Sequence, residues 1–85
     1  MMRSLHLIRK TVDPLAQEAI AFEARSGSVA VLLIQDGVLN RNPFPGEVFV
    51  SEEDLEARAQ LSPHRKRGYE EIARLVVEYD RTVVW

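Results

Sequence analysis

The sequence of 85 residues contains no cysteine, and this absence removes a whole group of chemistries. Without a thiol, the chain forms no disulfide, no thiolate metal site and no cysteine nucleophile. Any thiol chemistry in which the protein takes part must be supplied by another chain. A glycine-rich phosphate loop of standard spacing is also missing. The two histidines, His6 and His64, lie far apart without the spacing of a metal site, so we expect no metal and no cofactor.

Long hydrophobic runs are also missing. The longest apolar stretches have about five residues, whereas a membrane-spanning helix needs roughly 20. The apolar part of the N-terminal stretch MMRSLHLIRK is too short for a signal peptide. The formal net charge of −2 gives a field that does not favour nucleic acid. We therefore expect a cytoplasmic protein with no membrane partner and no direct contact with nucleic acid.

The composition that remains is that of a folded chain. Hydrophobic residues make up 46% of the sequence and charged residues 28%, which is ordinary for a globular domain and not for a disordered one. The length predicts a single domain spanning residues 1–85. So small a domain is only marginally stable alone and often completes its core against a partner. An oligomer, hetero or homo, is therefore expected.

The first half of the chain has the pattern of a strand, a helix and a second strand. Residues 5–8 predict a short, mostly buried strand. In the helix that follows, Asp13 is the expected N-cap, Pro14 the first helical residue and Gly27 the left-handed residue past the end. Its expected apolar face comprises Val12, Leu15, Ala16, Ala19 and Phe22. The unbroken apolar run 28–34 predicts a strand covered on both faces, as in a parallel sheet.

The second half repeats this alternation more loosely. A Pro- and Gly-containing loop, 40–46, precedes a strand at 47–50, and Ser51 opens a short helix of about two turns. A further helix is expected from Ser62-Pro63, with an apolar face comprising Tyr69, Ile72, Ala73, Val76 and Val77. The chain ends in a fourth strand, 81–85. The sequence thus predicts a small single-domain α/β fold of three layers, with helices on the faces of a mostly parallel, four-stranded sheet.

Polar residues follow three of the expected strands. They are Arg9 and Lys10, then Gln35, Asp36 and Gly37, then Ser51. The carboxyl ends of parallel strands meet at one edge, where ligands bind in open α/β sheets. This edge is the one site-like constellation in the chain. Asp36-Gly37 is also typical of a plain turn, and Arg9 and Lys10 of solvated strand ends.

The remaining polar features favour structure or partner binding over catalysis. His6 lies within an apolar strand without an accompanying nucleophile, which favours a satisfied, partly buried histidine over a general base. The basic cluster of His64, Arg65, Lys66 and Arg67 falls at the start of the third expected helix, where its cations oppose the helix dipole. This cluster is either a solvated helix start or a surface for an anionic partner. Trp85 is expected in the core or at an interface.

Four blocks of the sequence together resemble the DsrH/TusB family. They are LHLIRK at 5–10, LLIQDGVL at 32–39, VSEEDLEARAQL at 50–61 and the terminal VVW at 83–85. Their order and spacing cover most of the chain. Members of this family are small, cysteine-poor subunits of the DsrEFH and TusBCD sulfur-relay complexes.

The resemblance implies a DsrE-like fold and assembly with DsrE/TusD-like and DsrF/TusC-like homologous subunits. In these complexes sulfur travels as a persulfide on a cysteine of the DsrE/TusD-type subunit. It serves either tRNA 2-thiouridine formation at the wobble position or the oxidation of stored sulfur. The resemblance therefore implies a supporting subunit that is not an enzyme. Arg9, Lys10, Gln35, Asp36, Gly37 and Ser51 would form a polar rim near a partner's cysteine, and His64 to Arg67 with Trp85 a partner surface.

Two features depart from the family pattern. Some members carry a cysteine, and this chain has none. Members usually place a helix after the QDGV segment, where this chain has only the short 40–46 loop before its next strand. The alternative function is therefore a stand-alone homo-oligomer of the same fold that binds a small anion or acts as a regulator at the strand-end edge.

Overall fold

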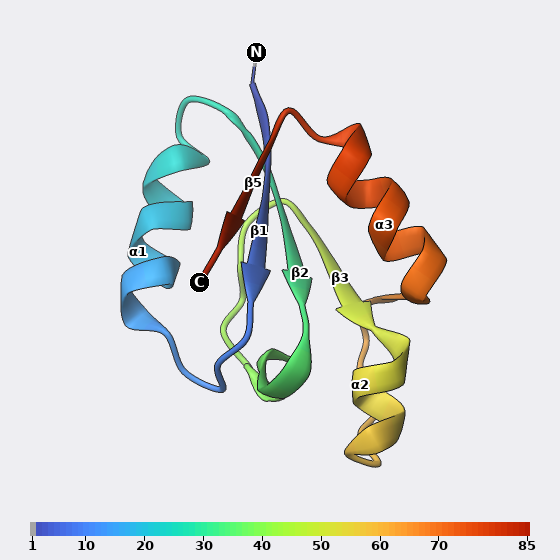
Figure 1. Cartoon of the computed structure of the whole chain (residues 1–85). Helices are drawn as coiled ribbons and strands as arrows, with labels where there is room; N and C mark the ends of the chain where they lie inside the picture. Colours follow the sequence, from blue (N-terminus) through green and yellow to red (C-terminus); the bar gives the residue numbers. More distant parts are fainter. Residues whose placement is uncertain (1) are drawn as a thin grey trace.

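A computed structural model describes residues 2–85, and a parallel sheet lies at its centre (Figure 1). This sheet has five strands. The strand order is β4-β3-β2-β1-β5, and every neighbouring pair is parallel. The strands are β1 (Arg3–Ile8), β2 (Ser28–Leu33), β3 (Glu47–Ser51), β4 (Arg65–Arg67) and β5 (Arg81–Val84). The helices are α1 (Pro14–Glu23), the 3₁₀ helix η1 (Gln35–Leu39), α2 (Glu52–Ala57) and α3 (Tyr69–Glu78). The expected α/β class is confirmed, with five strands instead of four.

The extra strand, β4, lies where the sequence predicted the start of a helix. Arg65–Arg67 pairs with the end of β3 at the edge of the sheet, and α3 begins only at Tyr69. Three consecutive cations carry no hydrophobic alternation, so nothing in the sequence marks them as a strand. Charged residues are tolerated there because an edge strand needs no burial, and they discourage pairing with another chain. The expected helix from Ser62-Pro63 was therefore wrong in its first turns.

The start of α1 follows the expected capping pattern, but its end does not. Asp13 caps the helix through Oδ1, which accepts from the backbone N–H of Ala16 at 3.1 Å, and Pro14 is the first helical residue. The helix ends at Glu23 with Ala24 still in the right-handed region. Gly27 donates its N–H to the carbonyl of Glu23 at 3.0 Å, and its φ is not positive. The expected left-handed Gly27 was therefore wrong.

The buried face of α1 differs from the one that the sequence predicted. Ala16 is buried as expected, but the other buried residue, Ile20, was not in the predicted face, and Leu15 and Phe22 of that face are each 70% exposed. Because apolar residues occur on two sides of this helix, helical periodicity alone did not indicate which side meets the sheet. The predicted face of α3 was also largely wrong: the buried residue is Leu75, which was not in it, while Tyr69 and Val77 face outward. Of the predicted face, Ile72 packs against the core.

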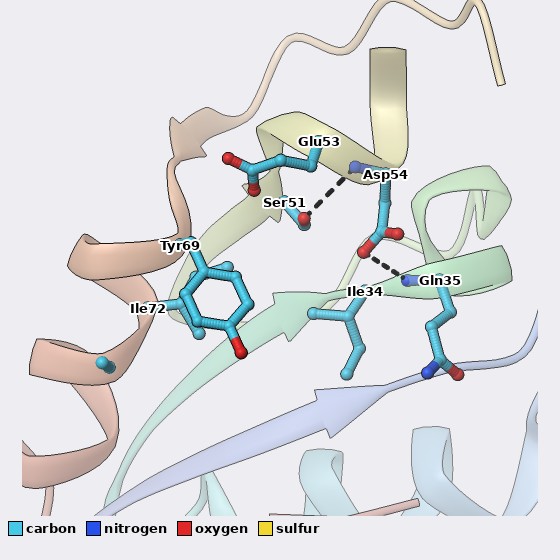
Figure 2. A pocket seen from close by; sticks show the side chains of 8 residues that line it. Ile34, Gln35, Ser51, Glu53, Asp54, Tyr69 and Ile72 are labelled. Carbon is cyan, nitrogen blue, oxygen red and sulfur yellow. Dashed lines mark hydrogen bonds between the residues drawn. The ribbon is translucent and has the colours of Figure 1, made fainter. Parts of the chain in front are cut away.

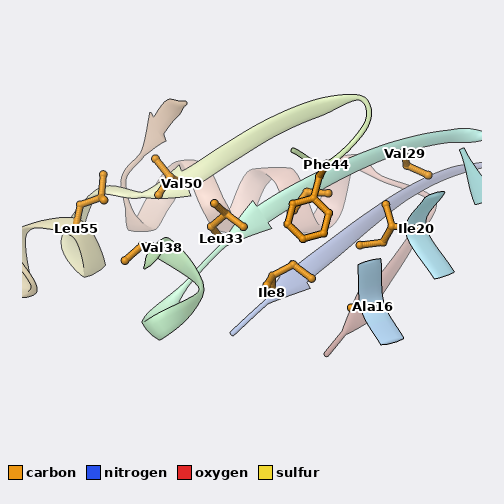
Figure 3. Close-up of a cluster of buried hydrophobic side chains, with 10 residues drawn as sticks. Ile8, Ala16, Ile20, Val29, Leu33, Val38, Phe44, Val50 and Leu55 are labelled. Carbon is orange, nitrogen blue, oxygen red and sulfur yellow. The ribbon is translucent and has the colours of Figure 1, made fainter. Parts of the chain in front are cut away.

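The two faces of the sheet carry separate hydrophobic clusters. On one face, Ile8 and Val31 pack with Ile20 of α1, Val38 of η1 and Phe44 of the following loop (Figure 3). On the other face, Leu5, Leu32 and Phe49 pack with Leu75 of α3. The result is three layers, with α1 and α3 on opposite sides of the sheet (Figure 1). Within residues 2–85, no helix has the length and hydrophobicity to span a membrane.

The crossover from β2 to β3 is made by η1 and an extended loop in place of a full helix. Phe44, 8% exposed, anchors this loop to the cluster on the α1 side. Glycine is required at two points of close approach. A Cβ on Gly37 would overlap the carbonyl oxygen of Ile8, and one on Gly46, which has a φ of 78°, would overlap that of Val29. The short 40–46 segment can cross the sheet because its backbone lies directly against the strands.

Candidate functional site

A pocket of about 420 Å³ opens at the carboxyl ends of β2 and β3 (Figure 2). It lies on the α3 side of the sheet, between the start of α2 and the start of α3. Its lining residues come from four elements and the segments that join them: Ile34, Gln35, Ser51, Glu53, Asp54, Tyr69, Ile72 and Ala73. Open parallel sheets place their ligand sites at this edge. The structure thus brings together two of the predicted site residues, Gln35 and Ser51.

Hydrogen bonds between η1 and α2 hold the pocket in shape. The buried hydroxyl of Ser51 caps α2 by accepting from the N–H of Asp54 at 3.3 Å. Asp54 in turn accepts from the backbone N–H of Gln35 at 2.8 Å (Figure 2). Gln35 has a φ of 52°, in the left-handed region that few non-glycine residues adopt. The bond to Asp54 helps to hold this strained backbone in place.

The character of the pocket is apolar at its base and acidic at its rim. Ile34, Ile72 and Ala73 give apolar surface, and Glu53 and Asp54 bring two carboxylates. The starts of α2 and α3 would attract anions, but acidic side chains already fill these positions. Glu71, for example, accepts from the backbone N–H of Gly68 at the start of α3 at 3.1 Å. The pocket therefore favours neutral or cationic groups over phosphate-like anions.

Asp36 and Gly37, which follow Gln35, serve the structure of this edge. Asp36 accepts from the guanidinium of Arg58 at 3.0 Å and lies outside the lining of the pocket. Arg58 also pairs with Asp54 at 3.4 Å, so it joins η1 to α2. Gly37 allows η1 to approach the end of β1. Asp36 and Gly37 thus have structural roles within the 3₁₀ helix η1, and not in a plain turn.

Arg9, Lys10 and Trp85 lie at the carboxyl ends of β1 and β5, away from the lining of the pocket. The guanidinium of Arg9 donates to the carbonyl oxygen of Trp85 at 2.9 Å. Lys10 lies 3.7 Å from the carboxylate of Asp13. The predicted edge is therefore divided into two parts, and its cations are engaged with the chain itself.

His6 forms part of a buried polar network on the α1 side of the sheet. The indole N–H of Trp85 donates to Nδ1 of His6 at 3.0 Å, so the proton of a neutral ring lies on Nε2 and donates to Glu23 at 2.9 Å. Arg81 also donates to Glu23 at 2.8 Å. With a relative exposure of 2% and both nitrogens bonded, His6 is a satisfied structural histidine, as the sequence predicted.

The surroundings of Glu23 change its acidity. Burial alone raises the pKa of this carboxyl group, but hydrogen bonds from Ser4 and His6 and the positive charge of Arg81 have the larger combined effect. The pKa of Glu23 is therefore lowered from its ordinary value of 4.5. The ionised form is stabilised, so this network loses a charge partner when the protein is acidified.

The cationic cluster at 64–67 is largely neutralised within the chain. Arg65 pairs with Glu47 at 3.3 Å, and Arg67 pairs with Glu71 at 3.7 Å while its guanidinium lies 5.0 Å from the centre of the Phe49 ring. The backbone N–H of His64 donates to the hydroxyl of Ser62 at 3.2 Å. Lys66 is exposed. This partial neutralisation weakens the case for a surface that binds an anionic partner.

Exposed apolar residues of α3 continue the surface of the pocket. We call Tyr69, Ala73, Val76 and Val77 the α3 stripe; Tyr69 is 81% exposed and Val77 84%. Tyr69 and Ala73 also line the pocket. The pocket and the α3 stripe therefore form one continuous surface, which is apolar outside the acidic rim.

Sequence reasoning missed several residues that matter at these sites. Glu53, Asp54 and Tyr69 line the pocket, but the sequence assigned them only to a helix start or to the apolar face of a helix. Glu23 and Arg81 carried no local signal, because their partners are distant in the sequence. Among the described residues, no group of three or more His, Asp or Glu side chains is arranged to hold a metal ion.

Comparison of the chain with protein-family models and with curated proteins finds no match. Over the described residues 2–85, the fold defines the class of a small α/β domain with an all-parallel, five-stranded sheet and three α-helices.

Proposed function

We propose that this chain is a non-catalytic subunit of a sulfur-relay assembly of the DsrEFH/TusBCD type, in which it supports a cysteine-bearing homologous subunit. One observation carries the proposal. Two blocks on which the resemblance rests, LLIQDGVL and VSEEDLEARAQL, meet in the pocket at the strand ends. The first contributes Ile34 and Gln35, and the second contributes Ser51, Glu53 and Asp54.

In this proposal the pocket receives a segment of the partner that carries the reactive cysteine. The chain has no thiol of its own, so the sulfur stays on the partner throughout. The α3 stripe supplies apolar surface for docking beside the pocket. Gln35 and the acidic rim would shape the approach to the partner's cysteine. The assembly would work in the cytoplasm, where thiols are kept reduced. It would serve either tRNA thiolation or sulfur oxidation.

The alternative, an anion-binding homo-oligomer, receives less support at this edge. Arg9 is bonded to the carbonyl of Trp85, and Lys10 lies next to Asp13. The pocket itself is bordered by Glu53 and Asp54. A small anion would therefore meet carboxylates where it would need free cations.

Co-purification tests the proposed function. The chain is co-expressed with DsrE- and DsrF-like proteins from the same genome, and we expect it to be recovered in a stable complex with them. Val77→Glu places a charge in the α3 stripe and should abolish recovery of the complex. Leu61→Glu is the matched control, because Leu61 is 85% exposed and lies outside both the pocket and the α3 stripe. A wild-type chain that stays alone under these conditions would overturn the proposal.

A further inference from the structure

A second apolar surface lies on α1, on the other side of the sheet from the α3 stripe. We call Leu15, Ala19 and Phe22 the α1 stripe; Leu15 and Phe22 are largely exposed, and Ala19 is half-buried between them. These residues border an open groove of about 620 Å³ between α1 and β5, which Glu18, Ser26 and Arg81 also line. Contiguous exposed apolar surface often marks a site of protein–protein interaction.

Two charged residues beside the α1 stripe lack an ion-pair partner among the described residues. Within 2–85, neither Glu18 nor Arg25 takes part in an ion pair. The guanidinium of Arg25 lies 5.6 Å from the centre of the Phe22 ring, so it borders the stripe directly. Glu18 lines the groove beside Leu15 and Ala19. Glu18 lies within α1, and Arg25 lies two residues beyond the end of this helix, so the two charges border the α1 stripe at different points along its length.

We propose that the α1 stripe is the contact between two copies of this chain, packed with their α1 helices antiparallel. In such a pair the two helices run in opposite directions, and the same side of one helix meets the same side of the other. Glu18 of each copy then faces Arg25 of the other, so the contact contains two Glu18–Arg25 ion pairs. A parallel pair would place Glu18 of the two copies on opposite sides of the contact, so these ion pairs would not form. The two-fold arrangement is the usual one for homodimers, because one self-complementary patch serves both copies.

Packing favours the same arrangement. Ala19 is the small residue between two large ones, and it leaves room for the Phe22 ring of the other copy. An aromatic side chain seated in a hollow of this kind is a typical anchor of a protein interface. The groove toward Arg81 gives additional space for the ring.

The size of this surface sets the expected strength of the dimer. A standard interface buries about 800 Å² on each partner, and the whole chain exposes 5260 Å². The α1 stripe spans two turns and is smaller than a standard interface. We therefore expect a weak, concentration-dependent dimer, with a dissociation constant in the micromolar range or above.

This inference goes beyond the proposed function, because it uses a different face. The pocket and the α3 stripe stay free in the dimer, so a relay subunit and a second copy can bind at the same time. The two proposals can be tested independently. Loss of self-association would leave co-purification through the α3 stripe unchanged, and loss of co-purification would leave self-association unchanged.

Sedimentation equilibrium of the chain alone tests the dimer. We expect the wild type to dimerise with increasing concentration, and Phe22→Glu to raise the dissociation constant by about 30-fold or more, as for other anchor residues. Val77→Glu, which lies on the other face, should dimerise like the wild type, and circular dichroism checks that each variant is folded. A wild type that stays monomeric up to about 1 mM, or a dimer that Phe22→Glu does not weaken, would overturn the proposal. Loss of the dimer in Val77→Glu alone would assign self-association to the α3 stripe and would also overturn it.

Charge reversal tests the antiparallel register without disturbing the apolar residues. Glu18→Arg and Arg25→Glu should each weaken the dimer, because each brings like charges together, by about fivefold for exposed pairs. The double variant should recover the affinity of the wild type. An equimolar mixture of the two single variants should recover it as a heterodimer, since every Arg then faces a Glu. Failure of both the double variant and the mixture to recover would rule out this register.

Discussion

At Gly37 the backbone of η1 runs against the end of β1, and no side chain fits between them. A methyl group on this residue would lie closest to the carbonyl of Ile8, which is fixed by its place in the sheet. The carbonyl oxygen of Ile8 also accepts from the backbone N–H of Ile34 at 3.0 Å. A methyl group at residue 37 would therefore push η1 away from the sheet and disturb the edge that carries the pocket.

Gly37→Ala should lower the free energy of unfolding by about 2 kcal/mol, since overpacking against a rigid backbone has costs of this order. Gly27→Ala is the control, because its added methyl would be no closer than 3.6 Å to the carbonyl of Glu23 and its φ is not positive. The control should be neutral or slightly stabilising. Urea unfolding midpoints measure both effects. Equal midpoints for the two variants would contradict the close approach.

Among the secondary-structure elements, those with a local signal were predicted well from the sequence. The unbroken apolar run at 28–34 gave β2, and Asp13 with Pro14 marked the start of α1. β4 has no such signal, because its three cations are held only by pairing with β3. The orientations of α1 and α3 also depend on tertiary contacts, since both helices carry apolar residues on two sides.

The candidate site could also be predicted only in part from the sequence. Parallel topology places Gln35 and Ser51 at one edge, and strand order can be argued from the sequence. The pairing of Gln35 with Asp54, and the position of Tyr69 over the pocket, depend on how α2 and α3 settle on the sheet. Long-range contacts such as that between His6 and Trp85 could not be predicted, because no local sequence pattern indicates them.

The cap of α1 gives a prediction at the scale of the helix. Asp13→Ala removes the acceptor for the N–H of Ala16 and should lower the free energy of unfolding by about 1 kcal/mol. Asp13→Asn keeps a capping oxygen, so it should lower the free energy of unfolding much less than Asp13→Ala does. Thermal or urea unfolding followed by circular dichroism measures the difference. Equal losses for Ala and Asn would show that the ion pair with Lys10, not the cap, is what Asp13 contributes.

For the whole molecule, Glu23 joins three elements through His6 of β1 and Arg81 of β5. Its pKa is lowered in the folded state, so its contribution to stability is present above about pH 4.5. The contribution is lost as the pH falls through the folded-state pKa.

Glu23→Gln should therefore lower stability most at neutral pH, and the difference from the wild type should shrink as the pH falls below about 4.5. Gln retains an oxygen that can accept from Nε2 of His6, so the variant removes mainly the charge. Glu56→Gln, at an exposed position of α2, controls for the removal of a carboxylate as such. Urea unfolding at a series of pH values gives the comparison. If the free energies of unfolding of Glu23→Gln and the wild type differ by the same amount from neutral to acid pH, the charge of Glu23 does not have this role.

The contact between Trp85 and His6 has a practical consequence, because Trp85 is the sole tryptophan of the chain. The two rings stack with their centres 6.2 Å apart, next to the ladder that attaches β5 to β1. Indole emission is thus an intrinsic optical signal for one edge of the sheet. Detachment of β5 would expose the fluorophore to water, while events in the pocket on the far side would leave its spectrum unchanged. Trp85 fluorescence therefore distinguishes detachment of β5 from binding in the pocket.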